Sequence, residues 1–440
     1  MPKLAIIADD LTGANDSGVQ FAKQGFQTIS LLDSRHAEYG RDADVWVLNA
    51  ETRSLDAEQA YAKITEICSS LSLSRIPYIY KKIDSTMRGN IGAEIDALMD
   101  QVHFDLAVVI PAYPGNSRVT IGGYHLVNQM LLEDSEIARD PKSPVRQSHL
   151  PTMLSSQSKH AVGHIELMVV RQPQRLADEL KRQKAEGKQI IVFDSYAQHD
   201  LQAVTQTLVD SGLRILWVGS AGLACSLSEV LSRGERSQPL RSALESDSQA
   251  PILVVAGSVS AVTNEQITVL GERAQFAIIA ADPLALLDTD KRPQEMRRLI
   301  DRAVALIDEG KSPILTTDTS DLARRGVEDW ITRTHTEALA AGNLLADCLG
   351  QLGAAIVAER TLCGFVLTGG DIAYRTCLHL DVKALQIVEE VEEGIPLSVA
   401  IGGPADHLPV VTKAGAFGQR FSLVHAVEKI QEKTRVEQGG

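Results

Sequence analysis

Short apolar runs alternate with amphipathic segments along almost the whole chain, and this alternation limits the folds open to it. The first half has apolar runs of strand type at Leu4–Ala8, Gln27–Leu32, Val45–Leu48, Tyr78–Ile83, Leu106–Ile110, Gln189–Phe193 and Ile215–Val218. Helical patterns lie between them, for example at Ala57–Ser69, Ile91–Met99 and Gln174–Glu186. Repeated strand–helix units place parallel strands side by side and cover the sheet with helices. The sequence therefore predicts an α/β fold with mostly parallel sheets flanked by helices.

The alternation is interrupted once, in the polar segment Glu229–Ala250, whose glycine and proline residues are typical of an interdomain linker. A second α/β series follows, with strands expected at Ile252–Ala256, Phe276–Ala280, Pro313–Thr317, Gly364–Thr368, Leu397–Ile401 and Val410–Lys413. A chain of 440 residues also exceeds the usual size of one hydrophobic core. We predict two domains, 1–235 and 251–440, each with a mostly parallel sheet, joined by a linker at 236–250.

The composition argues against several classes of partner. The net charge of −14 comes without a basic block, so a nucleic-acid partner is not expected. The five cysteines are scattered without a C-x-x-C pair, which gives no metal signature and is typical of a reducing compartment. No apolar stretch approaches the ~18 residues of a membrane span, and the N-terminus lacks a signal-peptide pattern. We therefore expect a cytoplasmic protein without a membrane partner.

The first predicted strand ends in two adjacent carboxylates, Asp9 and Asp10, followed by Thr12 and a helical pattern. Acidic side chains at the carboxyl end of a parallel strand lie where open α/β sheets bind their ligands. Two neighbouring carboxylates repel each other unless a cation, a donor or a substrate hydroxyl offsets the repulsion. Asp10 or Thr12 could instead cap the next helix, but one cap accounts for one residue and not for the cluster. The cluster favours a functional site.

Three further loops at the predicted sheet edge carry polar side chains. The segment just past Tyr78–Tyr80 has the highest density, because Lys82, Asp84, Ser85 and Arg88 occur there within seven residues. Lysine and arginine at such a position can bind a carboxylate or phosphate, although a capped helix start with solvated charges is the alternative. The other two loops add basic and amide groups at Arg53, Asn116 and Arg118. Cations beside aspartates fit a small polyhydroxylated acid.

The second predicted domain carries glycine-rich turns after its strands, which let backbone amides approach a ligand closely. Three of these turns contain the candidate nucleotide contacts Ser258, Gly369, Gly370, Asp371, Lys413 and Gly415. Asp371 could hold Mg²⁺ or cap a helix. Single glycine turns are weak signals, but three in one domain, one of them with a lysine, indicate a phosphate cradle of nucleotide type.

Two other patterns carry no prediction of a site. Glu309–Ser312 has the letters of a Walker A end, but its lysine follows a helix instead of preceding one, so the segment is expected to be a helix C-terminus. The histidines His125, His149 and His164 are isolated in the sequence, and we assign none of them a metal role.

Taken together, these motifs resemble the four-carbon acid sugar kinase family. In this sequence the matching segments, in order, are Ala8–Gly13, Lys82–Asn90, Pro111–Arg118, Gly257–Ser258, Thr368–Asp371 and Lys413–Gly418. Within the family, Asn15–Gln20 looks most like the branch acting on D-threonate, with D-erythronate and 3-oxo-tetronates as alternative substrates. The resemblance implies a sugar-acid-binding N-terminal domain, an ATP-binding C-terminal domain, and Mg²⁺-dependent transfer of phosphate to the 4-hydroxyl. A homodimer would fit, and a sugar-acid-binding protein without catalysis is the rival class.

The resemblance suggests roles for the candidate residues. Arg53, with Lys82 or Arg88, would hold the substrate carboxylate, while Asp10 or Asp84 would accept the proton of the 4-hydroxyl. Asp9, Ser85 and Asn116 would contact the remaining substrate groups. Ser258, Gly369, Gly370, Asp371 and Gly415 would surround the nucleotide, with Lys413 near its phosphates. Domain closure would exclude water during transfer.

Overall fold

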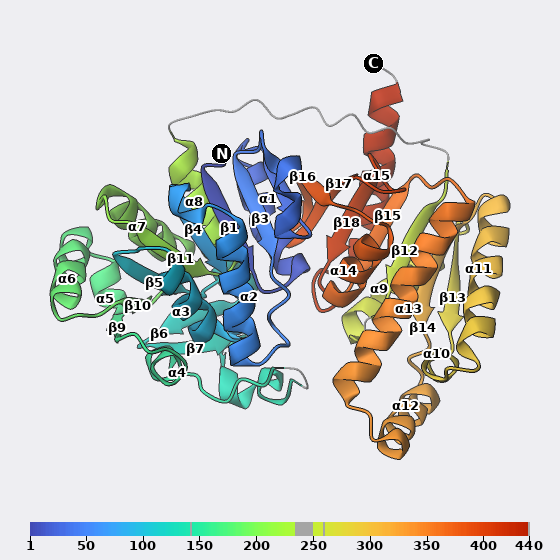
Figure 1. Cartoon of the computed structure of the whole chain (residues 1–440), viewed down its shortest axis with the longest axis horizontal. Helices are drawn as coiled ribbons and strands as arrows, with labels where there is room; N and C mark the ends of the chain where they lie inside the picture. The colour runs from blue at the N-terminus through green and yellow to red at the C-terminus, as the bar shows by residue number, and fades with distance from the viewer. Residues whose placement is uncertain (141–142, 234–249, 258–259, 439–440) are drawn as a thin grey trace. The chain divides into compact units, whose positions relative to one another are not determined.

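The computed structural model describes residues 1–140, 143–233, 250–257 and 260–438 (Figure 1). Contacts divide the chain into two compact units, Met1–Leu240 and Arg241–Gly440. Each unit contains a mostly parallel sheet covered by helices, so the predicted fold class is confirmed. Of the predicted linker at 236–250, all residues except Ala250 lie outside the described part.

The sheet of the first unit is parallel throughout, with the strand order β2-β3-β1-β4-β11-β5-β10-β9. In chain order its strands are β1 (Leu4–Ala8), β2 (Thr28–Leu31), β3 (Val45–Asn49), β4 (Tyr78–Lys82), β5 (Leu106–Ile110), β9 (Val162–Ile165), β10 (Ile190–Phe193) and β11 (Ile215–Gly219). Strands covered on both faces need apolar side chains on both sides, which explains the continuous apolar runs of β1, β5 and β11. After β1 the chain forms β2 and β3 on one side of that strand, and β4 then starts the other side. The strand order therefore reverses between β1 and β4.

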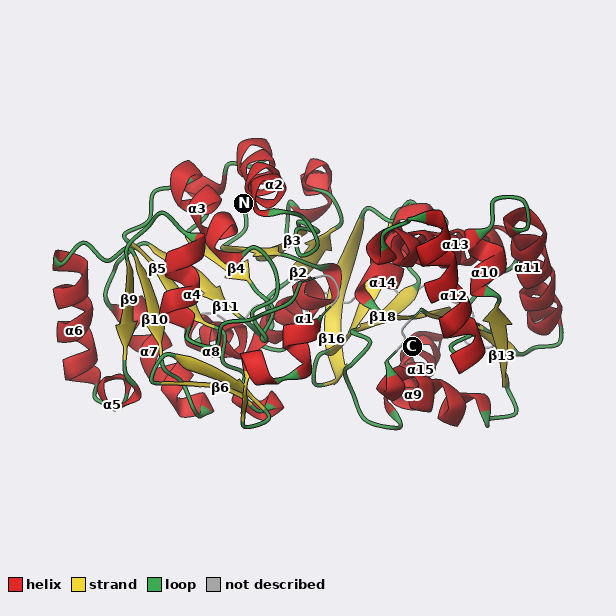
Figure 2. Ribbon diagram, turned by 90° about the horizontal axis from the view of Figure 1, so that it is seen from below, coloured by secondary structure: helices red, strands yellow, loops and turns green. Residues whose placement is uncertain are grey.

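Helices cover both faces of this sheet (Figure 2). One face carries α1 (Leu11–Ala22), α7 (Gln198–Asp210) and α8 (Ala221–Ser232), and the other carries α2 (Ala57–Ser70) and α3 (Ile91–Gln101). Three further helices complete the unit at α4 (Leu150–Gln157), α5 (Leu167–Val170) and α6 (Pro173–Ala185). The helices leave the carboxyl ends of β1 and β4 accessible to loops, which is where this fold class binds its ligands.

A small antiparallel sheet follows β5 and was not predicted. Its strands are β6 (Arg118–Ile121), β7 (Tyr124–Val127) and β8 (Met130–Leu131). Two-residue turns join them, and all four turn residues, Gly122, Gly123, Asn128 and Gln129, have positive φ angles of 50° to 76°. Such turns match the twist of a β-hairpin. The short 3₁₀ turns Leu132–Asp134 and Glu136–Arg139 then lead the chain back towards the loop after β4.

The second unit has the strand order β13-β14-β12-β15-β18-β17-β16. The bounds are β12 (Ile252–Ala256), β13 (Phe276–Ala281), β14 (Ser312–Thr317), β15 (Gly364–Thr368), β16 (Ala384–Glu392), β17 (Ile395–Ile401) and β18 (Pro409–Lys413). The sheet is parallel from β13 to β18, whereas β17 is antiparallel to both β16 and β18. The order reverses between β12 and β15, so this unit has its own ligand-binding edge.

Helices lie on both faces of the second sheet as well. The helix α9 (Ala261–Gly271) packs with α15 (Ser422–Gln438), and α14 (Gly370–His379) packs with α13 (Ala338–Glu359). The remaining helices are α10 (Pro283–Leu287), α11 (Arg292–Asp308) and α12 (Asp321–Thr334). Helix α11 ends before Glu309–Ser312, so the Walker-like letters do form a helix terminus.

One described helix, α13, is long and apolar enough to cross a membrane by length and composition. It contacts α11 and α14, and two of its glycines lie close to α14. A Cβ on Gly350 would stand 2.9 Å from the backbone of Arg375, and a Cβ on Gly353 would stand 3.2 Å from Thr376. Close packing against neighbouring helices identifies α13 as a packing helix of the second unit.

Candidate functional site

The loops after β1, β3 and β4 meet at the point where the strand order of the first unit reverses. Ala8, the last residue of β1, is in register with Asn49 of β3 on one side and with Lys82 of β4 on the other. Each of these loops leaves its strand at the same edge. The predicted residues Asp9, Asp10, Arg53 and Asp84 therefore come together from segments up to 75 positions apart.

Arg53 neutralises the carboxylate pair that follows β1. Its Nε donates to Asp9 Oδ2 at 2.7 Å and its Nη1 to Asp10 Oδ2 at 3.0 Å. Its Nη2 donates to both residues, at 3.0 Å to Asp9 Oδ1 and at 2.6 Å to Asp10 Oδ1. Burial alone would raise the pKa of Asp9, but Arg53, Lys81 and Lys82 outweigh it and hold that pKa below its ordinary value. Arg53 thus gives four of its five N–H groups to protein carboxylates.

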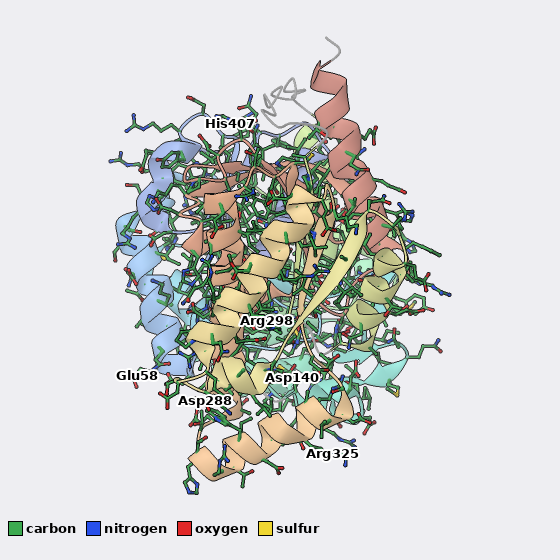
Figure 3. The ribbon with its side chains drawn as sticks, turned by 90° about the vertical axis from the view of Figure 1, so that its right-hand side faces the viewer. Glu58, Asp140, Asp288, Arg298, Arg325 and His407 are labelled. Carbon is green, nitrogen blue, oxygen red and sulfur yellow. The ribbon has the colours of Figure 1, made fainter. Side chains whose placement is uncertain are left out.

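A second ion cluster forms in the loop after β4. Arg88 binds Asp84 through two hydrogen bonds, Nε to Oδ2 at 2.9 Å and Nη2 to Oδ1 at 3.0 Å. Its Nη1 also reaches Asp140, which is labelled in Figure 3, at 3.1 Å. Burial would raise the pKa of Asp84, but Arg88 and Arg53 outweigh it and hold the pKa well below its usual range. Asp84 therefore stays ionised and is a weak proton acceptor.

The two adjacent lysines of β4 point to opposite faces of the sheet, as alternation along a strand requires. Lys81 is fully buried and forms an ion pair with Glu94 of α3, which is also buried. Lys82 lies on the other face beside α1, and it is only 4% exposed. Within the described residues, Lys82 has neither a carboxylate at ion-pair distance nor a hydrogen bond from its ammonium. A buried ammonium with no carboxylate at ion-pair distance has the chemistry to bind an anion.

Asp10 combines a structural role with its place in the cluster. It is the N-cap of α1, accepting a hydrogen bond from the Gly13 amide at 3.1 Å and one from Thr12 Oγ1 at 2.7 Å. The capping interpretation and the site interpretation are both correct for this residue. Gly13 is also spatially constrained, because a Cβ there would lie 2.5 Å from Asp10 Oδ1 and 2.7 Å from Lys82 Nζ.

The remaining predicted contacts of the first unit, Ser85 and Asn116, use their carbonyl groups within the protein. The Ser85 carbonyl bonds His125 Nε2 at 2.8 Å, and His125 Nδ1 bonds Thr120 Oγ1 at 2.9 Å, so the small sheet anchors this loop. Asn116 ends a 3₁₀ turn and contributes its carbonyl to Arg118 Nη1. Within the part of the chain that the structure describes, its side chain makes no hydrogen bond to the carboxylates.

Arg118 was noted in the sequence but not placed in the site. Burial lowers its pKa, with Asp84 opposing, and its Nε lies buried without a hydrogen-bond acceptor among the described residues. Glu94 was not identified from the sequence as a residue of the site, because a single charged residue among apolar residues of a helix carries no specific signal. The pair Lys81–Lys82 could have indicated Glu94. Adjacent residues of a strand face opposite sides of the sheet, so one of the two lysines must face the layer that contains α3 and needs an acidic partner there.

In the second unit, three strand ends bring the glycine turns together. Ala256 of β12 is in register with Thr368 of β15, which is in register with Lys413 of β18. Gly369 has φ 103°, and its amide donates to the Lys413 carbonyl at 2.8 Å, so the protein itself uses this amide. Gly370 opens α14 with Asp371 in its first turn. Ser258 lies outside the described residues.

Lys413 points into the protein. Its side chain is among the largest that are fully buried, and its ammonium donates to the carbonyls of Ala414 at 3.0 Å, Gly415 at 3.4 Å and Phe417 at 3.1 Å. It also donates to Thr263 Oγ1 at 3.3 Å. Burial lowers the pKa of Lys413 to about 8, although Glu392 opposes the shift.

The second unit has a carboxylate, Asp371, where a Mg²⁺ ion bound to phosphate groups could be held. The described residues include no group of three or more His, Cys, Asp or Glu side chains that could hold a metal ion. Mg²⁺ usually takes only one or two protein carboxylates and completes its shell with phosphates and water. Asp371, exposed beside the Gly369–Gly370 turn, has the position and chemistry of such a single ligand.

Both units match known family models. The model described as a sugar-binding N-terminal domain covers residues 4–227, and the model described as a nucleotide-binding C-terminal domain covers residues 253–423. Among curated relatives, a D-threonate kinase of Salmonella typhimurium is 35% identical over 98% of this chain and 99% of its own. A D-erythronate kinase of Heliobacterium modesticaldum is 31% identical over 98% of each chain. A 3-oxo-tetronate kinase of Pseudomonas fluorescens is 28% identical over 95% of each.

Solved structures show the same fold. A protein of Salmonella typhimurium LT2, named as a tRNA synthase, superposes with a TM-score of 0.81 at 24% identity, covering 97% of this chain and 99% of its own. A protein of Haemophilus influenzae superposes with a TM-score of 0.72 at 22% identity, covering 97% and 100%. At these identities the likeness concerns the fold alone.

Proposed function

The chain belongs to the four-carbon acid sugar kinase family, and we propose that it transfers a phosphoryl group from ATP to the 4-hydroxyl of D-threonate. The product would be 4-phospho-D-threonate. The relative with 35% identity carries the name of a D-threonate kinase, which supports this choice over D-erythronate and 3-oxo-tetronates.

The buried ammonium of Lys82 is the observation that carries the proposal. Arg53 and Arg88 each bind two protein carboxylates, which already balance the charge of each guanidinium. Lys82 has no such partner among the described residues and lies beside the carboxylates of Asp9 and Asp10. A sugar acid offers one carboxylate for this cation and several hydroxyls for the neighbouring aspartates. Arg118 supplies a second basic group at the same loops.

Asp10 is our choice for the proton acceptor. Asp84 is the weaker candidate, because Arg88 and Arg53 hold its pKa low. In the transfer, a bond forms between the 4-oxygen and the γ-phosphorus, and the bond from that phosphorus to the ADP oxygen breaks. The hydroxyl proton passes to an Asp10 oxygen. Arg53 fixes the orientation of Asp10 throughout, and positioning of this kind is the main contribution of a protein to phosphoryl transfer.

The second unit would hold the nucleotide at the turns after β12, β15 and β18. ATP with Mg²⁺ supplies the phosphoryl group and neutralises charge on it. Asp371 would bind the metal, and Gly370 and Gly415 lie where backbone amides can approach phosphates. Ser258 stays a candidate from the sequence. We also propose a cytoplasmic enzyme that forms a homodimer, which light scattering can check.

A Lys82→Met variant tests the anion role of Lys82. We expect the KM for D-threonate to rise about 10- to 100-fold, because a charge-assisted hydrogen bond is lost, while the KM for ATP stays within about twofold. Steady-state ADP release measures both constants. Lys63→Met, on an exposed face of α2, serves as the control and should behave as wild type. An unchanged KM for D-threonate in Lys82→Met would remove Lys82 from the substrate site.

A further inference from the structure

Lys413 is the basic residue of the glycine loop after β18, yet its ammonium is directed away from solvent. The side chain is 1% exposed, and its hydrogen-bond acceptors are Thr263 Oγ1 and the carbonyls of Ala414, Gly415 and Phe417. An ammonium has three hydrogens to donate, so these four acceptors use all of them. Lys413 has no donor left for a phosphate group.

The same contacts fix the direction of the loop amides. In a planar trans peptide, the C=O of one residue and the N–H of the next point in opposite directions. The carbonyls of Ala414, Gly415 and Phe417 point towards Lys413, so the N–H groups of Gly415, Ala416 and Gly418 point away from it. Within the described residues, none of these three N–H groups donates to a protein acceptor.

Three N–H groups that face outward from one short loop supply the donors that an anion-binding nest requires. We propose that Lys413 is a positioning residue, which gathers the loop carbonyls inward so that the amides of Gly415, Ala416 and Gly418 bind the nucleotide phosphates. This inference rests on the proposed function for its ligand, but the orientation of the loop rests on the structure of the second unit alone.

A second residue supports the loop from α9. Thr263 is fully buried, accepts a hydrogen bond from Lys413 and donates one to the Gly415 carbonyl at 2.5 Å. Gln266, one turn later on α9, donates to the carbonyls of Phe417 and Gln419 at 3.2 and 2.8 Å. Lys413, Thr263 and Gln266 thus all donate to carbonyls of this loop. Two of these side chains are uncharged, so the loop conformation does not depend on the lysine alone.

Hydrogen exchange of the nucleotide-free protein separates positioning from direct contact. If Lys413 orients the loop, Lys413→Met speeds exchange of the Phe417 amide, which donates to the Ala414 carbonyl, by at least about tenfold, and Thr263→Val does so several-fold. Arg420→Met is the matched control, because Arg420 is exposed beside the same loop and pairs weakly with Glu265; it should leave exchange unchanged. Unchanged exchange in a folded Lys413→Met protein that no longer binds ATP would make Lys413 a direct phosphate ligand and overturn the proposal.

Kinetics give a second readout with its own signature. We expect Lys413→Met and Thr263→Val to raise the KM for ATP while the KM for D-threonate stays at its wild-type value. Since burial lowers the pKa of Lys413 to about 8, against the opposing charge of Glu392, the wild-type KM for ATP should rise between pH 7 and 9. Lys413→Met should lose that pH dependence, and its persistence in the variant would count against the proposal.

If Lys413→Met fails to fold, Thr263→Val still tests whether these side chains hold the loop in its conformation. Wild-type loop exchange in folded Thr263→Val would then contradict the inferred support of the loop. Failure of the proposed function looks different, because the wild-type protein would then release no ADP with any four-carbon acid while the exchange result would still hold.

Discussion

Asp10 shows how one side chain can satisfy both local structure and chemistry. Its oxygens cap α1 and also bind Arg53, so its position is fixed from two directions. The sequence could identify the acidic pair, because two carboxylates after a strand have no packing value. The pairing with Arg53 could not be predicted with certainty, since it depends on the register of β1 with β3, 44 positions away in the sequence.

Asp10→Asn tests the assignment of the proton acceptor without removing the helix cap, because asparagine caps helices as well as aspartate does. We expect kcat to fall by about 10²- to 10⁴-fold, as is usual when a general base is lost, and the melting temperature to fall as well, because Arg53 loses one of its two ionised partners. Asp84→Asn should instead act mainly on the KM for D-threonate, since it releases Arg88 from its carboxylate. Full turnover in Asp10→Asn would show that another group accepts the proton.

His125 is a fully buried residue whose neutral form anchors the Ser85 loop. Burial lowers its pKa from 6.5 to about 4, with the Ser85 hydrogen bond opposing the shift and Arg118 reinforcing it. The native protein then binds the proton less readily than the unfolded chain, so stability from this group is complete above about pH 6.5 and is lost as the pH falls towards 4.

We therefore expect wild-type protein to lose about 3 kcal/mol more unfolding free energy than His125→Gln between pH 7 and pH 4. Urea unfolding at several pH values measures the difference. His149→Gln, a substitution at a partly exposed histidine of the same unit, is the control and should follow wild type. Parallel curves for wild type and His125→Gln would show that His125 does not titrate as inferred.

At the scale of elements, sequence periodicity predicted most of the sheet strands and missed specific ones. The runs of β1, β5, β12 and β15 are continuous, apolar and buried, so they are easy to recognise. The strand β16 was missed because three of its nine residues are glutamates and it is only partly buried. The small sheet had a signal that was not used, namely the pair Gly122–Gly123 between two short runs, which is typical of a two-residue hairpin turn.

The sequence could not predict which way the carbonyl and amide groups of the loop after β18 point. A lysine beside glycines resembles a phosphate-binding lysine, and only the folded loop shows that its carbonyls surround the ammonium. The choice between contact and positioning depends on φ and ψ angles of a few loop residues, which the residue types permit but do not determine.

Gly13 tests the contact between α1 and β4. Alanine in a helix usually stabilises it by up to about 1 kcal/mol relative to glycine. A Cβ at Gly13 would meet Asp10 Oδ1 and Lys82 Nζ within 2.7 Å, so we expect Gly13→Ala to displace both groups and reduce kcat/KM by at least about tenfold.

Gly342→Ala is the matched control, because a Cβ at this position of α13 meets no atom within 4 Å. It should raise the melting temperature slightly and leave kinetics unchanged. Wild-type kcat/KM in Gly13→Ala would mean that the two groups need not stay where the structure has them.

At the scale of the whole molecule, two α/β units each have a point where the strand order reverses, and the candidate residues of each gather at that edge. The first unit offers aspartates beside a buried lysine, and the second offers outward amides on glycine turns. On the proposed function, an acidic chain with a net charge of −14 binds anionic molecules because a few basic groups and backbone amides are concentrated locally. We therefore predict an enzyme whose first unit binds a sugar acid and whose second unit binds a nucleotide.

A coupled ADP-release assay over D-threonate, L-threonate, D-erythronate and 3-oxo-tetronates tests that claim most directly. Reactions without acid and reactions with Asp10→Asn provide the background. We predict acid-dependent ADP release with the highest kcat/KM for D-threonate, and one phosphate transferred for each ADP formed. Release of no ADP with any of these acids would contradict the kinase assignment, and a higher kcat/KM for another acid would contradict the choice of substrate.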